Sequence, residues 1–180
     1  MLEPSTFHAI FVEVVVGSFT LSGIAFLLIL VLSNNPKIVD WSDKAAHFGL
    51  ALGVIFLPLA IISGMNSGDL GGSELLAKKT VYSFSVFGLG IGLLVNRWKS
   101  QNFLAKKMLY QGHASFGIIN FGLVAITGSL GGKMTRGESL LDIFGIGEFT
   151  YAAFPTWVSG LMIIIALLII FLPQKSSVKH

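Results

Sequence analysis

Five long apolar stretches, separated by short polar connections, dominate this 180-residue sequence. A helix that crosses the hydrocarbon core of a membrane needs about 20 mostly apolar residues. Inside lipid the backbone must satisfy its own hydrogen bonds, which favours helices. The expected spans are residues 7–32, 45–63, 81–95, 109–130 and 153–172. The sequence therefore predicts an all-α integral membrane protein, a five-helix transmembrane bundle that forms a single domain over residues 1–180.

Composition narrows the class of protein further. Only 12% of the residues are charged and the mean hydropathy is +0.80, whereas soluble domains carry about 25% charged residues. The chain has no cysteine, which excludes disulfides, iron–sulfur clusters, thiolate zinc sites and c-type haem attachment. No phosphate-binding loop or nucleophile motif is present, so the chain is not expected to be a catalyst on its own.

The basic residues follow the membrane topology rather than forming a stripe for nucleic acid, so no nucleic-acid partner is expected. The first and third connections and the C-terminal tail share one side of the membrane in a five-span topology. That side carries eight basic residues: Lys37, Lys44, Arg97, Lys99, Lys106, Lys107, Lys175 and Lys179. The other side carries four: Lys78, Lys79, Lys133 and Arg136. Because basic residues concentrate on the cytoplasmic side, we expect the N-terminus outside and the C-terminus in the cytoplasm.

Two further patterns concern the organisation of the helices. The second span runs from His47 to AIISG and LGGSE, and the fourth runs from His113 to VAITG and LGGKM. This similarity suggests two repeated hairpins followed by an extra C-terminal helix. In the long connection after the fourth span, four apolar residues predict a short helix on the membrane surface: Leu140, Leu141, Ile143 and Phe144.

Two histidines stand where apolar stretches begin, in DKAAHFGLALG (43–53) and YQGHASFGIIN (110–120). Because the second and fourth spans enter the membrane from the same side, His47 and His113 are expected at the same end and at similar depth. Two neutral imidazoles on facing helices can supply both axial ligands of a haem iron. The pair therefore predicts a b-type haem between His47 and His113, with these two residues as the metal ligands.

Neighbouring residues fit a haem site. Gly49, Gly112 and Gly117 are expected to let a flat macrocycle approach the backbone. Asn120 shares a helical stripe with His113 and Gly117 and is expected to face the bundle interior. The basic residues available for the haem propionates are Lys44, Arg97, Lys99, Lys106 and Lys107. The alternative is that the histidines hydrogen-bond across helices and the glycines only allow close helix packing.

A second candidate metal site lies in FHAIFVEVVVG (7–17), which contains His8 and Glu13. An unpaired carboxylate in apolar surroundings costs several kcal/mol, so Glu13 is expected to be protonated, paired or metal-bound. His8 and Glu13 are about 140° apart around a helix, so another helix would have to complete a site. The residues at a matching level are Met65, Thr127 and the Gly131-Gly132 turn. The alternative is a neutral Glu13 that hydrogen-bonds to a serine or threonine of a neighbouring helix.

The stretch FHAIFVEVVVG resembles the first helix of a family of small, uncharacterised bacterial and archaeal membrane proteins. That helix typically opens with His-Pro and carries a second His five residues later, followed by Phe-Pro. The family's last helix ends in a Thr-Gly and Gly-Gly turn, similar to ITGSLGGKM (126–134) here. The resemblance covers residues 7–137. It implies a prokaryotic cell membrane and, because some members are thought to bind haem or serve membrane redox systems, a redox role.

The chain also departs from that family's pattern. Ala9 stands in place of the first Pro, Glu13 in place of the second His and Val15 in place of the second Pro. The third helix lacks the His that is often found near its start, and the fifth helix is additional. Only His8 and the Gly131-Gly132 pair carry over.

Two functions follow from these features. The first is a small integral membrane subunit of a redox or respiratory-type assembly, with a b-type haem that transfers electrons and a quinone as a candidate partner. The second is a non-catalytic, accessory subunit of a larger membrane enzyme, such as a respiratory complex or a membrane monooxygenase, with no cofactor of its own. For both functions, the expected partners are the lipid bilayer and other membrane subunits. A transporter is a third interpretation, to which Glu13, Pro58 and Asn120 point.

Overall fold

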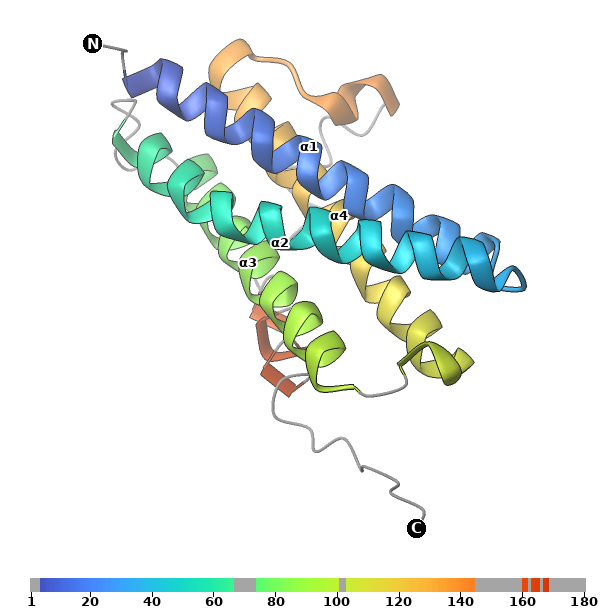
Figure 1. The fold of residues 1–180 in the computed structure, drawn as a ribbon. Helices are drawn as coiled ribbons and strands as arrows, with labels where there is room; N and C mark the ends of the chain where they lie inside the picture. The colour runs from blue at the N-terminus through green and yellow to red at the C-terminus, as the bar shows by residue number, and fades with distance from the viewer. Residues whose placement is uncertain are drawn as a thin grey trace.

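The computed structural model describes residues 4–66, 74–100 and 103–144, and short stretches between 160 and 168. These residues are helical wherever they form regular structure. The long helices are α1 (Pro4–Val31), α2 (Pro36–Asn66), α3 (Glu74–Lys99) and α4 (Lys107–Arg136). Two short 3-10 helices are η1 (Phe103–Ala105) and η2 (Leu140–Phe144). The four long helices lie side by side as a bundle (Figure 1).

All four long helices are long and apolar enough to cross a membrane, so the described residues confirm an all-helical fold and are consistent with a membrane protein. The expected fifth span, residues 153–172, falls largely outside the described residues, and it is not shown to be transmembrane. The helices extend beyond the expected membrane spans. For example, α2 begins at Pro36 and α3 at Glu74, because helical hydrogen bonding continues through polar turns that a count of apolar residues leaves out.

Local chemistry explains where several helices begin and end. Pro4 and Pro36 occupy first helical positions, where the missing N–H of proline costs nothing. α4 ends at Gly137, whose φ of 76° is left-handed and whose N–H donates to the Lys133 carbonyl. Two residues on, the Ser139 N–H donates to the Asp142 carboxylate at 2.6 Å. This turn leads into η2 and confirms the short helix predicted after the fourth span.

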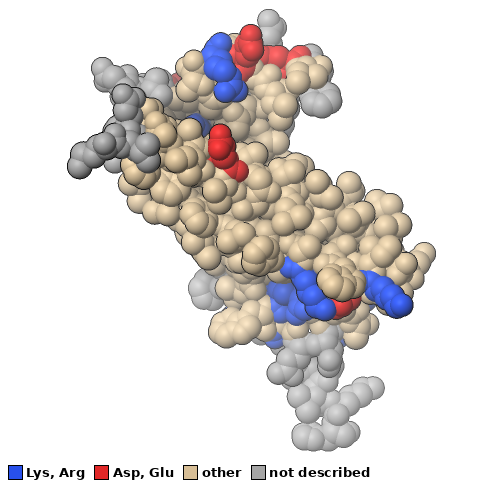
Figure 2. Space-filling view, turned by 45° about the horizontal axis from the view of Figure 1, so that its top comes forward, with Lys and Arg blue, Asp and Glu red and all other residues tan. Residues whose placement is uncertain are grey.

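α1 packs along α2 and also against α4, and α3 packs along α4 and α2. α1 finishes at the same end of the bundle at which α2 and α4 begin (Figure 1). We call this the paired-histidine end and the other the His8 end. Charged side chains gather at both ends, and the visible surface between them is almost entirely uncharged (Figure 2). That charge distribution suits a bundle whose middle lies in hydrocarbon.

Candidate functional site

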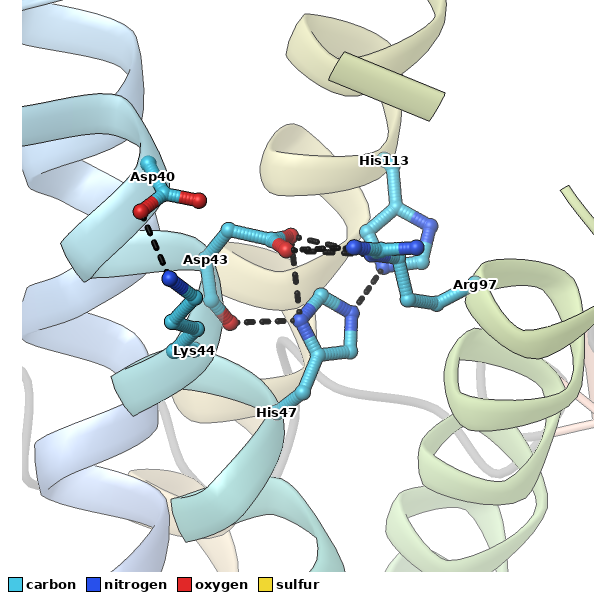
Figure 3. Close-up of polar contacts among 6 residues, drawn as sticks. All are labelled: Asp40, Asp43, Lys44, His47, Arg97 and His113. Atoms are coloured by element: carbon cyan, nitrogen blue, oxygen red, sulfur yellow. Dashed lines mark hydrogen bonds and ion pairs between the residues drawn. The ribbon is translucent and has the colours of Figure 1, made fainter. Parts of the chain in front are cut away.

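Two histidines meet at the paired-histidine end. His47 of α2 and His113 of α4 point at each other, with 2.9 Å between their Nε2 atoms (Figure 3). Their ring centroids are 5.1 Å apart, and the ring planes are inclined by 31°. The ring of His113 is buried, with 6% of the residue exposed. Ala46 and Ala114, which stand next to the two histidines in the sequence, are fully buried.

The hydrogen-bond pattern assigns the protons of the pair. The Nδ1 atom of His47 lies 2.7 Å from the backbone carbonyl oxygen of Asp43. A carbonyl oxygen can only accept, so His47 carries a proton on Nδ1. When His47 is neutral, its Nε2 therefore has a free lone pair, and the Nε2–H of His113 donates to it. The arrangement is a directional chain from His113 to His47 to Asp43.

The chain ends in an ion pair. Asp43 lies one helical turn before His47 on the same face of α2, and its carboxylate is 3.2 Å from the Nδ1 of His47. Arg97 of α3 donates from Nε and Nη2 to that carboxylate at distances between 2.9 and 3.3 Å. The Asp43 side chain is only 4% exposed, whereas the Arg97 side chain is 34% exposed. Arg97 thus compensates a buried carboxylate that touches His47.

Two phenylalanines close the site. Phe26 of α1 is fully buried, and its ring centroid lies 5.5 Å from that of His47 and 5.8 Å from that of His113. Phe103 of η1 packs edge-on against both imidazoles, and the Arg97 guanidinium lies 5.0 Å from its ring centre. These rings shield the imidazole contact from water, which strengthens electrostatic interactions inside the site. Among the described residues, none hydrogen-bonds to Nδ1 of His113.

Two of the three glycines expected to border a macrocycle, Gly49 and Gly117, lie against α1. A Cβ added to Gly117 would lie 2.1 Å from the ring of Phe26, and one added to Gly49 would lie 2.6 Å from the Ser18 carbonyl oxygen. Both glycines therefore make room for α1, as in the alternative of close helix packing. Gly112 has no heavy atom near its Cβ position within 4 Å.

The two imidazoles are suitable ligands for a haem iron, but the distance between them and the position of Phe26 leave no room for the haem. Two neutral imidazoles facing each other are a suitable axial ligand set. Metal–nitrogen bonds of about 2 Å would place the two Nε2 atoms about 4 Å apart, against 2.9 Å here. Because Phe26 is nearly equidistant from the two imidazoles, its ring lies close to the plane midway between them, where a macrocycle would sit.

Asn120 lies two helical turns deeper on α4 than His113. It is 1% exposed and faces the interior, as expected from its stripe. Neither its amide nitrogen nor its amide oxygen has a hydrogen-bond partner among the described residues. The histidine chain therefore has no direct hydrogen-bonded link to Asn120 within that part of the structure.

His8 and Glu13, the second candidate metal site, do not lie together in the structure. At the His8 end, Nδ1 of His8 lies 3.2 Å from the Ser63 hydroxyl, which itself donates to the Ala60 carbonyl. His8 thus faces α2, whereas Glu13 is exposed on another face of α1. The described part of the chain offers Glu13 neither the expected serine or threonine nor an ion pair. Within that part, no cluster of three or more His, Asp or Glu side chains suits a metal ion.

Sequence analysis missed the carboxylate of the site. Asp43 was not singled out, and Arg97 was expected to bind propionates rather than Asp43. The available signal was the spacing of Asp43 and His47, which places both on one helical face. Other basic residues near this end also have partners: Lys44 pairs with Asp40 at 2.7 Å (Figure 3), and Lys107 donates to Asn34 at 3.1 Å.

Compared with known protein families, with curated proteins and with solved structures, the chain matches none.

Proposed function

We propose that this chain is a proton-handling subunit of a larger membrane assembly, and that His47 and His113 form its proton-loading site. The observation that carries the proposal is the direct 2.9 Å contact between the two imidazoles, next to the carboxylate of Asp43. Chains of histidine and carboxylate side chains inside membrane proteins are typical of proton relays. The aromatic enclosure supports the proposal because it keeps bulk water from exchanging with the shared proton.

The proposed relay has two steps, and each of them balances. A proton binds to Nδ1 of His113, the nitrogen without a hydrogen bond to a described residue. The Nε2–H of His113 then passes its proton to Nε2 of His47. This leaves His113 neutral, with its proton on Nδ1, and makes His47 an imidazolium. The charge comes to rest beside the Asp43 carboxylate, which stabilises it, and the reverse sequence releases the proton.

A relay of this kind needs a reaction that supplies or consumes protons. The two histidines carry charge but make and break bonds only to hydrogen. Reduction of a quinone takes up protons and its oxidation releases them, so a redox-type membrane assembly is a suitable setting, with other membrane subunits as partners.

Haem binding is the second candidate function. The orientation of the Nε2 atoms favours it, together with the bond from Nδ1 of His47 to a carbonyl, since metal-ligating histidines typically donate their other N–H in this way. In this case His47 and His113 would be the axial ligands, and the haem would supply one-electron transfer. The ring of Phe26 would have to leave its place beside the contact between the two imidazoles.

The test is nitrogen NMR of the full chain in lipid nanodiscs, with histidines labelled with ¹⁵N. Imidazole nitrogen shifts report which nitrogen carries a proton. On acidification we expect one proton per pair, with the signals of His47 and His113 changing together. The matched control is His113→Phe. In this variant the change of the His47 signals should no longer be coupled to a second histidine. Independent titration of the two histidines in the unmodified chain, or no proton uptake by the pair, would rule out the relay.

Absorption spectra of protein isolated from its native membrane, oxidised and dithionite-reduced, separate the two candidates. A sharp reduced α-band that disappears in both His47→Ala and His113→Ala would replace the relay with electron transfer through haem. A spectrum without that band, together with coupled titration, supports proton loading.

A further inference from the structure

Glu13 is a carboxylic side chain on the outward surface of α1, at a depth where lipid is expected. α1 has 28 residues and is about 42 Å long, whereas a hydrocarbon core is about 30 Å thick. If α1 is centred, about 6 Å of it extends beyond each side of the core. Glu13 lies about 13 Å from the start of α1, so it falls inside the core. It is exposed on the bundle surface there.

An exposed carboxyl group in hydrocarbon needs a partner. A polar group without a hydrogen bond in an apolar medium costs several kcal/mol, and ionisable residues facing lipid are rare. Glu13 makes no hydrogen bond or ion pair with the described residues, unlike His8 nearby, which bonds to Ser63. Its partner must therefore come from outside this part of the chain.

The surface around Glu13 is shaped for another helix. Gly17 is one turn further along the same face, and it is exposed with no heavy atom within 4 Å of its Cβ position. Apolar side chains continue the stripe, with Ile10 45%, Leu21 45% and Ile24 53% exposed. Helices in membranes associate closely at small residues and hydrogen-bond through polar ones. Glu13 and Gly17 provide both features side by side.

We propose that this face binds the same face of a second copy of the chain, with Glu13 of one copy bonded to Glu13 of the other. In a twofold dimer about an axis along the membrane normal, each interface residue meets its own counterpart at the same depth. A neutral carboxyl group contains both a donor and an acceptor, so two of them can form reciprocal hydrogen bonds. A second copy supplies, at the same depth, a carboxyl group that can both donate to Glu13 and accept from it.

Disulfide trapping tests this dimer, because the chain has no cysteine of its own. The full chain carries Gly17→Cys and is oxidised in membranes, and dimer formation is followed on denaturing gels. The matched control is Ile55→Cys on α2, an outward position that is 62% exposed and measures random collisions. We expect Gly17→Cys to cross-link at least about tenfold faster than the control.

Substitution of Glu13 tests the role of the carboxyl group. In the Gly17→Cys background, Glu13→Leu should slow cross-linking by about tenfold, whereas Glu13→Gln should retain it because an amide also donates and accepts. Cross-linking of Gly17→Cys at the collision rate would overturn the dimer and favour lipid or another protein as the occupant. An unchanged rate with Glu13→Leu would overturn the carboxyl pairing. Neither outcome depends on the histidine site.

Discussion

Asp43 is the residue on which the polar contacts of the site converge. Its carbonyl accepts from His47, and its carboxylate lies against both His47 and Arg97. Because Asp43 is almost fully buried, its negative charge depends on these neighbours. Such a carboxylate fixes the orientation of His47 and holds any positive charge that reaches it.

This burial predicts unequal effects of removing the two partners of the ion pair. Arg97→Met leaves the buried Asp43 carboxylate without its cation, and we expect a loss of about 3–5 kcal/mol in the free energy of unfolding. Asp43→Asn should cost less, because the Arg97 side chain is 34% exposed and can reach water. The double variant should cost less than the sum of the two. Unfolding by sodium dodecyl sulfate in mixed micelles measures all three.

The control is Lys44→Met. Lys44 also forms an ion pair, with Asp40, but the two side chains are 67% and 44% exposed. Its loss should change the free energy of unfolding by less than about 1 kcal/mol. Equal effects of Lys44→Met and Arg97→Met would mean that burial does not control the energy of the Asp43–Arg97 pair.

The residues of the site could be predicted only in part. Position along each span placed His47 and His113 at one end, because depth follows from counting residues. Whether two side chains on different helices touch depends on how each helix is rotated about its axis. That rotation follows from packing contacts such as Phe26 on Gly117, which join residues far apart in the sequence. The contact between Asp43 and Arg97, which joins α2 and α3, was missed for the same reason, whereas Asp43 and His47 lie one turn apart within α2.

At the scale of elements, glycines set the distance between α1 and its neighbours. We expect Gly49→Ala to cost about 1–3 kcal/mol, because the new methyl would meet the Ser18 carbonyl, which belongs to backbone. Gly117→Ala should be similarly harmful because of the buried Phe26 ring, and Phe26→Leu should relieve part of that loss. Thermal unfolding in detergent micelles measures these changes.

Gly122 supplies the matched control on α4. It has no heavy atom within 4 Å of its Cβ position, so Gly122→Ala should be neutral or should stabilise the helix by up to about 1 kcal/mol. If Gly117→Ala behaves like Gly122→Ala, α1 does not pack against Gly117 as closely as described here.

For whole helices, the sequence pattern predicted where four long helices lie, and each helix is longer than the apolar span expected within it. Long apolar stretches predicted α1, α2, α3 and α4 because crossing lipid requires a continuous apolar helix. The helices run past the apolar spans because the first turns of α2 contain polar residues such as Lys37 and Asp40, yet remain helical. Polar turns at the water interface are compatible with a helix, so hydropathy does not mark its boundary.

For the whole molecule, the remaining question is which side of the membrane the histidine pair faces. Six basic residues lie at or near the paired-histidine end: Lys37, Lys44, Arg97, Lys99, Lys106 and Lys107. Four lie toward the His8 end: Lys78, Lys79, Lys133 and Arg136. The excess predicts that the paired-histidine end is cytoplasmic. Protons would then reach His113 from the cytoplasmic side.

Cysteine labelling in intact cells decides the orientation. Met108, 89% exposed at the start of α4, and Ile143, 76% exposed in η2, mark the two ends. A membrane-impermeant maleimide should label Ile143→Cys in intact cells but Met108→Cys only after lysis. Because the native chain contains no cysteine, it serves as the unlabelled control. The reverse pattern would put His47 and His113 on the outer side, and the proposed site would then exchange protons with the exterior.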